Sequence, residues 1–192
     1  MMKVGKEDAL IIVDVQRDFT RGGALEVPKG DEVVPVLNKY IELFRKLKAP
    51  IIASRDWHPS NHRSFKPYGG KWPPHCIQNT KGAEFHPSLK LPNDAIIISK
   101  ATEPDKEAYS AFEGTELLET LHKRGVRRVF IGGLATEFCV KSTVFDAVKL
   151  GFKVFLLIDA IRGISDEGVR EAIKEMKEKG VEVIALQNIL IE

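Results

Sequence analysis

The sequence predicts an α/β fold built on an open, mostly parallel six-stranded sheet. Three observations lead to this prediction. Short apolar runs rich in β-branched residues alternate with longer amphipathic stretches, the runs are apolar at successive positions as in strands buried on both faces, and turn-forming residues separate them. Strands that alternate with helices imply βαβ units with right-handed crossovers. With 192 residues and no internal repeat or linker, we expect one domain over residues 1–192.

Each strand is predicted from one such apolar run. The six runs are Ala9–Val13, Ile51–Ser54, Ala95–Ser99, Arg128–Ile131, Phe152–Ile158 and Val181–Ala185. In the first of four predicted helices, apolar residues recur every three to four positions from Val33 to Leu47. Asp31 can cap its start, and Pro50 ends it. The other three predicted helices are Glu116–Arg124, Thr136–Leu150 and Asp166–Lys179.

The stretch from Trp57 to Pro92 interrupts this alternation. It is rich in Pro, Gly, His, Asn and Lys, lacks a clear period, and contains both tryptophans of the chain. Loops of this length in compact domains are usually functional or disordered. We expect this segment to be ordered around a site.

Composition excludes several classes of protein. Lys and Arg number 29 against 27 Asp and Glu, which argues against a nucleic-acid-binding protein. No apolar run approaches the roughly 20 residues that span a bilayer, so no membrane partner is expected. The first residues lack the apolar segment of a secretory signal, which favours a cytoplasmic location. In a reducing cytosol, Cys76 and Cys139 are expected to be free thiols.

Reactive side chains follow four of the predicted strands. Open parallel sheets place their sites at the carboxyl ends of the strands. The residues at these ends are Asp14, Asp56 with His58, Lys100, and Cys139. Together they predict a site at this edge of the sheet.

Cys139 is the candidate nucleophile. In GGLATEFCV a strand ends at the glycine pair, Thr136 can cap the next helix, and Cys139 falls in its first turn, where the helix end can stabilise a thiolate. Asp14 can accept the thiol proton, and Lys100 can keep that carboxylate ionised. The alternatives are an inert core cysteine, a turn aspartate and a surface lysine.

The segment after Asp56 suggests a metal site. Asp56 and His58 point to the same side of an extended chain, and the stiff Trp72-Pro-Pro-His75 segment can bring a third ligand close. Two imidazoles and a carboxylate suit a divalent ion, either zinc, iron or manganese. His62 is a fourth ligand or a supporting residue, and the alternative is a solvated loop.

Aromatic residues near these positions are ambiguous. Phe19, Tyr109 and Phe112 can line a pocket or belong to the core, and Cys76 is interpreted as a bystander. The chain has neither GxGxxG nor a Walker loop, so nucleotide binding has no support.

Taken together, the motifs resemble the nicotinamidase branch of the isochorismatase-like cysteine hydrolases. The matching segments run from residue 9 to about residue 147 and include ALIIVDVQRDF, SRDWHP, KWPPHC, AYSAFEGT and GGLATEFCV. DWH and WPPH distinguish this branch from isochorismatases, which lack the metal site.

The resemblance implies roles for individual residues. Asp14, Lys100 and Cys139 match the catalytic triad, and Asp56, His58 and His75 match the metal ligands, with His62 where some members supply another. Phe19 and Trp72 match the walls around a pyridine ring, with Leu134 and Tyr109 as further pocket residues. The Leu134–Ala135 bond matches a cis peptide, and the N–H groups of Ala135 and Cys139 match the oxyanion hole. The family implies helices on both faces of the sheet, and many members are homo-oligomers.

The implied reaction is hydrolysis of nicotinamide to nicotinate and ammonia through a thioester on Cys139, in NAD salvage. Pyrazinamide would fit the same slot. Three rival hypotheses are an amidase of the same superfamily acting on a carbamoyl or ureido substrate, a metallohydrolase in which metal-bound water attacks directly, and a non-catalytic binding domain.

Overall fold

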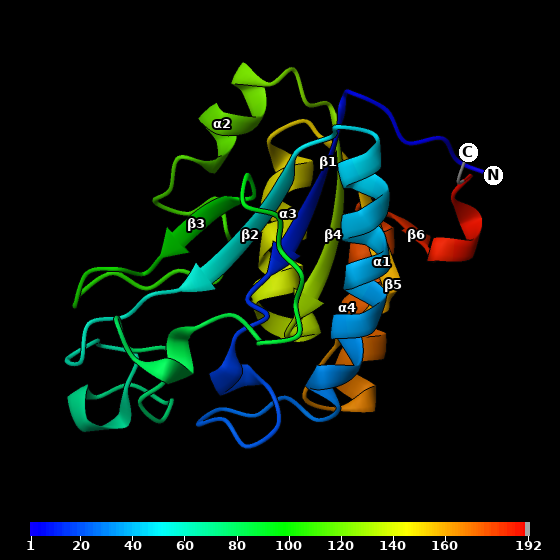
Figure 1. The fold of residues 1–192 in the computed structure, drawn as a ribbon. Helices are drawn as coiled ribbons and strands as arrows, with labels where there is room; N and C mark the ends of the chain where they lie inside the picture. Colours follow the sequence, from blue (N-terminus) through cyan, green and yellow to red (C-terminus); the bar gives the residue numbers. More distant parts are fainter. Residues whose placement is uncertain (191–192) are drawn as a thin grey trace.

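One parallel sheet organises the computed structural model, which describes residues 1–190 (Figure 1). Within these residues the sheet has six strands: β1 (Asp8–Val13), β2 (Ile51–Asp56), β3 (Ile96–Lys100), β4 (Arg128–Leu134), β5 (Lys153–Arg162) and β6 (Glu182–Ile184). Their order is β3-β2-β1-β4-β5-β6, and every neighbouring pair is parallel. The predicted fold class is therefore confirmed.

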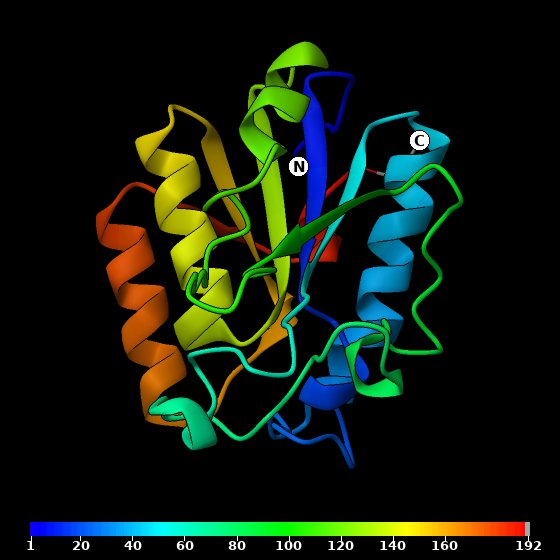
Figure 2. The ribbon, with the colours of Figure 1, turned by 90° about the vertical axis from the view of Figure 1, so that its left-hand side faces the viewer.

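Helices cover both faces of the sheet, as Figure 2 shows. The helices are α1 (Val33–Lys46), α2 (Leu117–Lys123), α3 (Lys141–Lys149) and α4 (Asp166–Glu178). On β1, Leu10 and Ile12 pack in the core under α1, whereas Ala9 and Ile11 pack in the core under the other three helices. Successive side chains of a strand point to opposite faces, so a strand covered on both sides must be apolar throughout.

Two helix starts differ from the predictions. Asp31 does not cap α1 but lies in a 3₁₀ turn, η2 (Gly30–Glu32), where its carboxylate accepts the Arg21 N–H at 2.8 Å and pairs with His86 at 2.9 Å. Thr136 does not cap the helix after β4, because Ala135 occupies the N-cap position. That helix begins as a π-helical turn, η5 (Thr136–Val140), and continues as α3. Both capping predictions were wrong, because a short turn of another helical type precedes each of these α-helices.

Strands β4 and β5 extend beyond their predicted ends. The pairing continues through Gly133 with Ile161 and Leu134 with Arg162, after a register shift beyond Ile131. Gly133 has φ +125°, and a Cβ there would lie 2.1 Å from the carbonyl oxygen of Val13. Glycine thus lets β4 continue close against β1 and carry the chain to the site.

The segment between β2 and β3 is ordered at the carboxyl ends of the strands (Figure 1). Its helical parts are two 3₁₀ turns, η3 (Lys66–Tyr68) and η4 (Lys81–Ala83). The buried Gln16 side chain holds the segment in place: its amide donates to the carbonyls of Asp56 at 2.8 Å and Ala83 at 3.0 Å, and accepts the Asp56 N–H at 2.9 Å.

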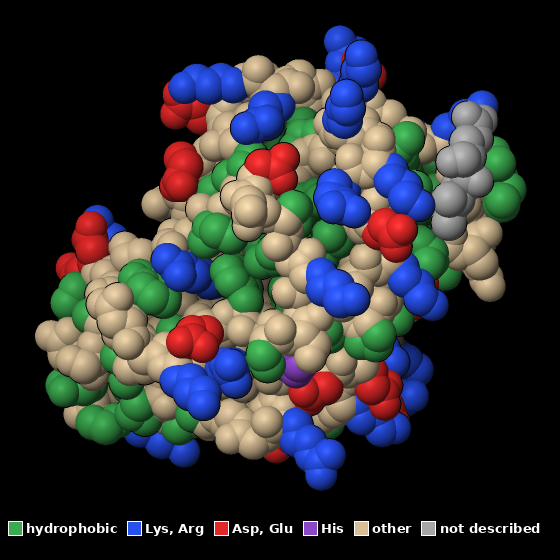
Figure 3. All heavy atoms as spheres, viewed as in Figure 1, with side chains coloured by type: hydrophobic (Ala, Val, Ile, Leu, Met, Phe, Trp, Pro, Cys, Tyr) green, Lys and Arg blue, Asp and Glu red, His purple; other side chains and the backbone are tan. Residues whose placement is uncertain are grey.

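Basic and acidic side chains are interspersed on the face of the molecule that carries α1 (Figure 3). Among residues 1–190, none of the helices combines the length and apolar character that a bilayer crossing requires.

Candidate active site

The structure brings Asp14, Lys100 and Cys139 together at the carboxyl ends of β1, β3 and β4. The Lys100 ammonium lies 2.9 Å from Asp14 Oδ2 and 3.5 Å from Cys139 Sγ. All three residues are buried, with exposed fractions of 0% for Asp14, 1% for Lys100 and 6% for Cys139. A thiol, a carboxylate and an ammonium group in contact can carry out nucleophilic chemistry with proton transfer.

The strand registers explain this convergence. Asp14 directly follows β1 with φ +49°, and its carboxylate accepts a hydrogen bond from Ser54 Oγ on β2 at 2.7 Å. Lys100 is the last residue of β3 and pairs in register with Asp56, the last residue of β2. Cys139 lies in the π-helical turn after β4, where its carbonyl accepts the Thr143 hydroxyl at 2.7 Å.

Burial and the neighbouring charges together set the protonation of the triad. Burial raises the pKa of Asp14, against the opposing charge of Lys100. Burial also raises the pKa of the Cys139 thiol well above its ordinary value, against the opposing charge of Lys100. For Lys100, burial alone would lower the pKa, but the carboxylates of Asp14 and Asp56 raise it well above normal. The resting site thus holds a charged lysine and a protonated thiol, which needs a base.

Asp56, His58 and His75 form a second group beside the triad. Their ligand atoms lie within 4.8 Å of one another. Asp56 Oδ2 is 3.4 Å from His58 Nε2 and 3.8 Å from His75 Nε2. Each Nδ1 lies within hydrogen-bond distance of a backbone carbonyl, Ala101 for His58 at 2.9 Å and Pro73 for His75 at 2.8 Å. With Nδ1–H donated in this way, both Nε2 lone pairs face the carboxylate, the arrangement in which imidazoles bind metals.

Charge also fits a cation here. Burial would raise the pKa of Asp56, yet the charge of Lys100 above all, with the adjacent imidazoles of His58 and His75, holds that pKa well below its ordinary value. Asp14 and Asp56 with Lys100 amount to two negative charges and one positive charge, so a buried excess of negative charge remains. The donor set therefore fits a divalent ion such as zinc, iron or manganese.

His62 lies outside this metal-binding group. Its ring stacks on that of His58 at 4.1 Å. Nδ1 is 2.7 Å from Ser64 Oγ and Nε2 is 2.7 Å from the Lys106 carbonyl, so both ring nitrogens already have protein partners. Because both ring nitrogens are engaged in this way, we infer that His62 is a supporting residue of the site.

An apolar cavity of about 50 Å³ opens onto Cys139 and the metal-binding group. Phe19, Trp72, Tyr109 and Leu134 line it as predicted, and the Trp72 indole N–H donates to the Tyr109 hydroxyl at 3.2 Å. Four further residues line the cavity and were not predicted from the sequence: Leu25, Val27, Phe138 and Ile164. For Phe138, its position directly before Cys139 was an available signal.

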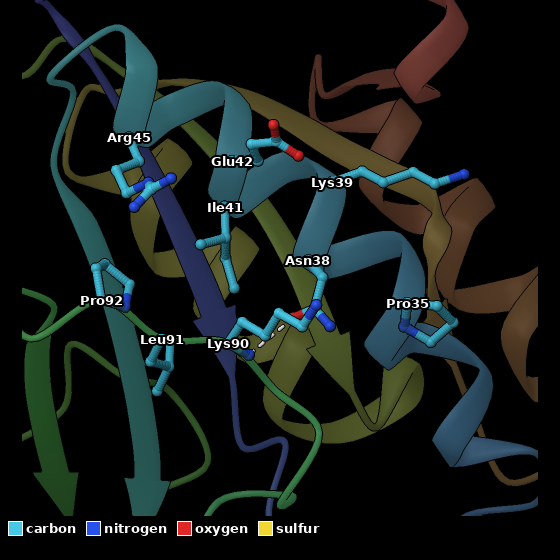
Figure 4. A pocket seen from close by; sticks show the side chains of 9 residues that line it. All are labelled: Pro35, Asn38, Lys39, Ile41, Glu42, Arg45, Lys90, Leu91 and Pro92. Atoms are coloured by element: carbon cyan, nitrogen blue, oxygen red, sulfur yellow. Dashed lines mark hydrogen bonds between the residues drawn. The ribbon is translucent and has the colours of Figure 1, made fainter.

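The structure also shows where other predicted positions lie. The Leu134–Ala135 peptide bond is cis, as the resemblance implied. Phe112 belongs to the core, where its ring stacks on Phe152 at 6.0 Å. A larger hollow of about 630 Å³ lies between α1 and the segment around Lys90 (Figure 4), and none of the predicted site residues lines it.

Comparison with known proteins places this arrangement in a family. The isochorismatase domain model matches residues 8–188. The chain belongs to the isochorismatase family. Within that family, it is 39% identical to a nicotinamidase of Acinetobacter baylyi, over 99% of this chain and 98% of the relative. It is also 39% identical to the nicotinamidase/pyrazinamidase of Mycobacterium tuberculosis, over 92% and 97%.

A solved structure of a family member resembles the whole fold closely. The pyrazinamidase of Pyrococcus horikoshii in complex with zinc superposes with a TM-score of 0.92 and is 57% identical, covering 94% of this chain and 99% of that one.

Proposed function

We propose that this protein is an amidohydrolase that converts nicotinamide to nicotinate and ammonia, and that also accepts pyrazinamide. The observation that carries the proposal is the contact of Lys100 with both Asp14 and Cys139 at the base of an apolar, aromatic-lined cavity. The similarity to nicotinamidases over almost the whole chain supports it.

The proposed reaction proceeds through a thioester on Cys139. Asp14 takes the thiol proton, and the sulfur attacks the amide carbon. The N–H groups of Ala135 and Cys139 bind the oxygen that becomes negative, and loss of one such donor would lower turnover on the order of 100-fold. Asp14 then returns the proton to the departing ammonia. In the second half, Asp14 accepts a proton from the water that attacks the thioester carbon, the C–S bond breaks, and Asp14 returns the proton to the Cys139 sulfur as the acid leaves.

Lys100 stabilises charge during these steps. Its ammonium faces both Asp14 and Cys139, so it stabilises the carboxylate before proton transfer and the sulfur anion after it. Burial raises the pKa values of both Asp14 and Cys139, so a negative charge on either group is costly, and the adjacent Lys100 ammonium offsets part of that cost.

The remaining site residues orient the substrate. Phe19 and Trp72 form walls for the pyridine ring, with Leu134 and Tyr109 beside them. Asp56, His58 and His75 would hold a divalent metal, which supplies a Lewis-acid anchor for the ring nitrogen when bound. Zinc is the first choice, given the zinc complex of the P. horikoshii protein, and iron or manganese suit the same donors.

Mass spectrometry tests the covalent step. Intact protein quenched during turnover with nicotinamide is expected to carry one nicotinoyl group on Cys139. Cys139→Ala should abolish ammonia release yet still bind nicotinamide, whereas Cys76→Ala, which changes the other buried cysteine, should retain turnover. Near-normal turnover by Cys139→Ala would instead favour direct attack by metal-bound water, and binding without hydrolysis by the unmodified protein would favour a binding domain. Hydrolysis of ureido compounds but not nicotinamide would favour the related amidase.

Three properties of the whole protein stay predictions. We propose that residues 1–192 act as one domain, which the family match over residues 8–188 supports. A cytoplasmic location with a role in NAD salvage, and assembly into a homo-oligomer, are expectations that accompany the proposed activity.

A further inference from the structure

Glu137 connects the nucleophile turn to the loop between β5 and α4. It lies two residues before Cys139 in the π-helical turn. Its carboxylate accepts the Ile164 N–H at 3.0 Å on Oε1 and 2.8 Å on Oε2, and the Ser165 N–H at 3.1 Å on Oε2. A charged acceptor with several donors holds a loop more firmly than a neutral one.

The surroundings of Glu137 are shaped around its carboxylate. A Cβ at Gly163 would lie 2.0 Å from Oε1, and one at Gly168 would lie 2.9 Å from Oε2. Ser165 caps α4 by accepting the Gly168 N–H at 3.0 Å, so the carboxylate lies beside the positive end of that helix. The glycines and the helix end thus fix the place of this carboxylate, and with it the loop.

The loop matters for the cavity because Ile164 is one of its walls. Ile164 is 45% exposed, whereas the other lining residues are buried or half-buried. The cavity has about 50 Å³, while a cavity of about 150 Å³ takes up benzene. A ring can therefore enter only if part of the wall yields, and Ile164 is the most exposed of the wall side chains.

We propose that Glu137 is a positioning residue that holds the 163–165 loop against the nucleophile turn, so that Ile164 limits the size of the ring that reaches Cys139. Phe138, the residue after Glu137, also lines the cavity. The Glu137 carboxylate therefore links the wall residue Phe138 in the nucleophile turn to the wall residue Ile164 in the loop. The inference rests on the proposed function, because it names the feature of the same site that selects among aromatic amides.

The test compares a one-ring and a two-ring amide. We would measure kcat and KM for nicotinamide and quinoline-3-carboxamide with the zinc-loaded enzyme. Ile164→Ala should raise the ratio of kcat/KM for the larger amide to that for nicotinamide about tenfold or more. Glu137→Ala should shift the ratio in the same direction and raise KM for nicotinamide about tenfold, with kcat changed much less. Glu137→Gln, which keeps one acceptor oxygen, should fall between. Glu171→Ala, an exposed change on α4, is the matched control.

Two outcomes would overturn the inference. One is a size ratio that stays at the unmodified value in both Ile164→Ala and Glu137→Ala. The other is an equal loss of kcat for both amides in Glu137→Ala with KM unchanged, which would make Glu137 a support of the nucleophile turn alone. If Glu137→Ala does not fold, the kcat/KM ratios of Ile164→Ala and Glu137→Gln still test the inference. If the unmodified protein leaves nicotinamide intact, the proposed function fails, and the ratio of dissociation constants in a Cys139→Ala background still tests the size limit.

Discussion

Replacement of Lys100 by methionine removes the ammonium group at the centre of the site. This group lies 2.9 Å from Asp14 Oδ2, 2.5 Å from Asp56 Oδ1 and 3.5 Å from Cys139 Sγ. The Lys100 side chain has no exposed surface. Methionine has a similar length and no charge, so the substitution tests electrostatics with little change of volume.

The expected loss of stability is large. Removal of one partner from a buried ion pair costs roughly 3–5 kcal/mol of unfolding free energy, because the remaining charge has no compensation. Lys123→Met is the matched control: its ammonium pairs with Glu119 at 2.9 Å, but its side chain is 74% exposed. An exposed helical pair of this kind contributes about 0.3–0.5 kcal/mol.

The loss should depend on pH, and its sign follows from Asp14. Burial already raises the pKa of Asp14 in the folded protein, and the Lys100 charge opposes that rise. Without Lys100 the pKa rises further, so the folded variant retains a proton that the unfolded chain releases. Its stability therefore falls as pH rises from the ordinary pKa of aspartate towards the raised value, by up to about 1.4 kcal/mol per pH unit for one proton.

Urea unfolding followed by circular dichroism, at about pH 5 and about pH 7.5, measures both effects on metal-free protein. Ammonia release from nicotinamide measures the catalytic loss. The electrostatic reasoning would be refuted if Lys100→Met were as stable as Lys123→Met at the higher pH, or if it kept the turnover of the unmodified enzyme.

Three further predictions concern neighbouring residues. Ser54→Ala removes the donor to Asp14 at 2.7 Å, so we expect a loss of about 1.5–3 kcal/mol in urea unfolding together with slower ammonia release. Thr136→Val replaces a buried hydroxyl that lacks a partner among the described residues; urea unfolding should show unchanged stability or a gain of up to about 2 kcal/mol, and a clear loss would mean that the hydroxyl is bonded. His75→Ala should lower the zinc bound per chain, measured by elemental mass spectrometry, while His86→Ala, whose ring pairs with Asp31, should not.

The carboxyl end of β1 was predictable because its sequence signal is local. A strand buried on both faces must be apolar throughout, so the polar residue that follows it marks the carboxyl end directly. Asp14 directly follows β1 in the structure, as predicted. Lys100, which was expected to follow the third strand, is instead the last residue of β3, and β3 is only partly buried. The composition of the long segment after Asp56 indicated that it is ordered. The side chain of Gln16 anchors this segment, but nothing in the sequence around Gln16, just after the first strand, indicated that role.

The cavity was less predictable because its walls come from loops. Leu25 and Ile164 belong to segments without a helical or strand period, so nothing in their spacing separates a pocket residue from an ordinary exposed one. The start of the loop that carries Ile164 was also predicted too early. The apolar run stops at Ile158, but β5 continues through the polar Asp159 to Arg162. Pairing with an extended β4 overrode that local pattern.

Asp56 shows why the triad and the metal-binding group could not be joined from the sequence. It was assigned to the metal alone, yet its Oδ1 is bound to Lys100 at 2.5 Å while Oδ2 faces His58 and His75. The link depends on the parallel register that pairs Asp56 with Lys100, and the apolar runs of these strands, Ile51–Ala53 and Ile96–Ile98, show no alternation that fixes such a register. A register shift of two residues would leave every side chain on the same face of the sheet. It would, however, move the Asp56 carboxylate out of contact with the Lys100 ammonium. One carboxylate therefore connects the electrostatics of metal binding to those of the nucleophile.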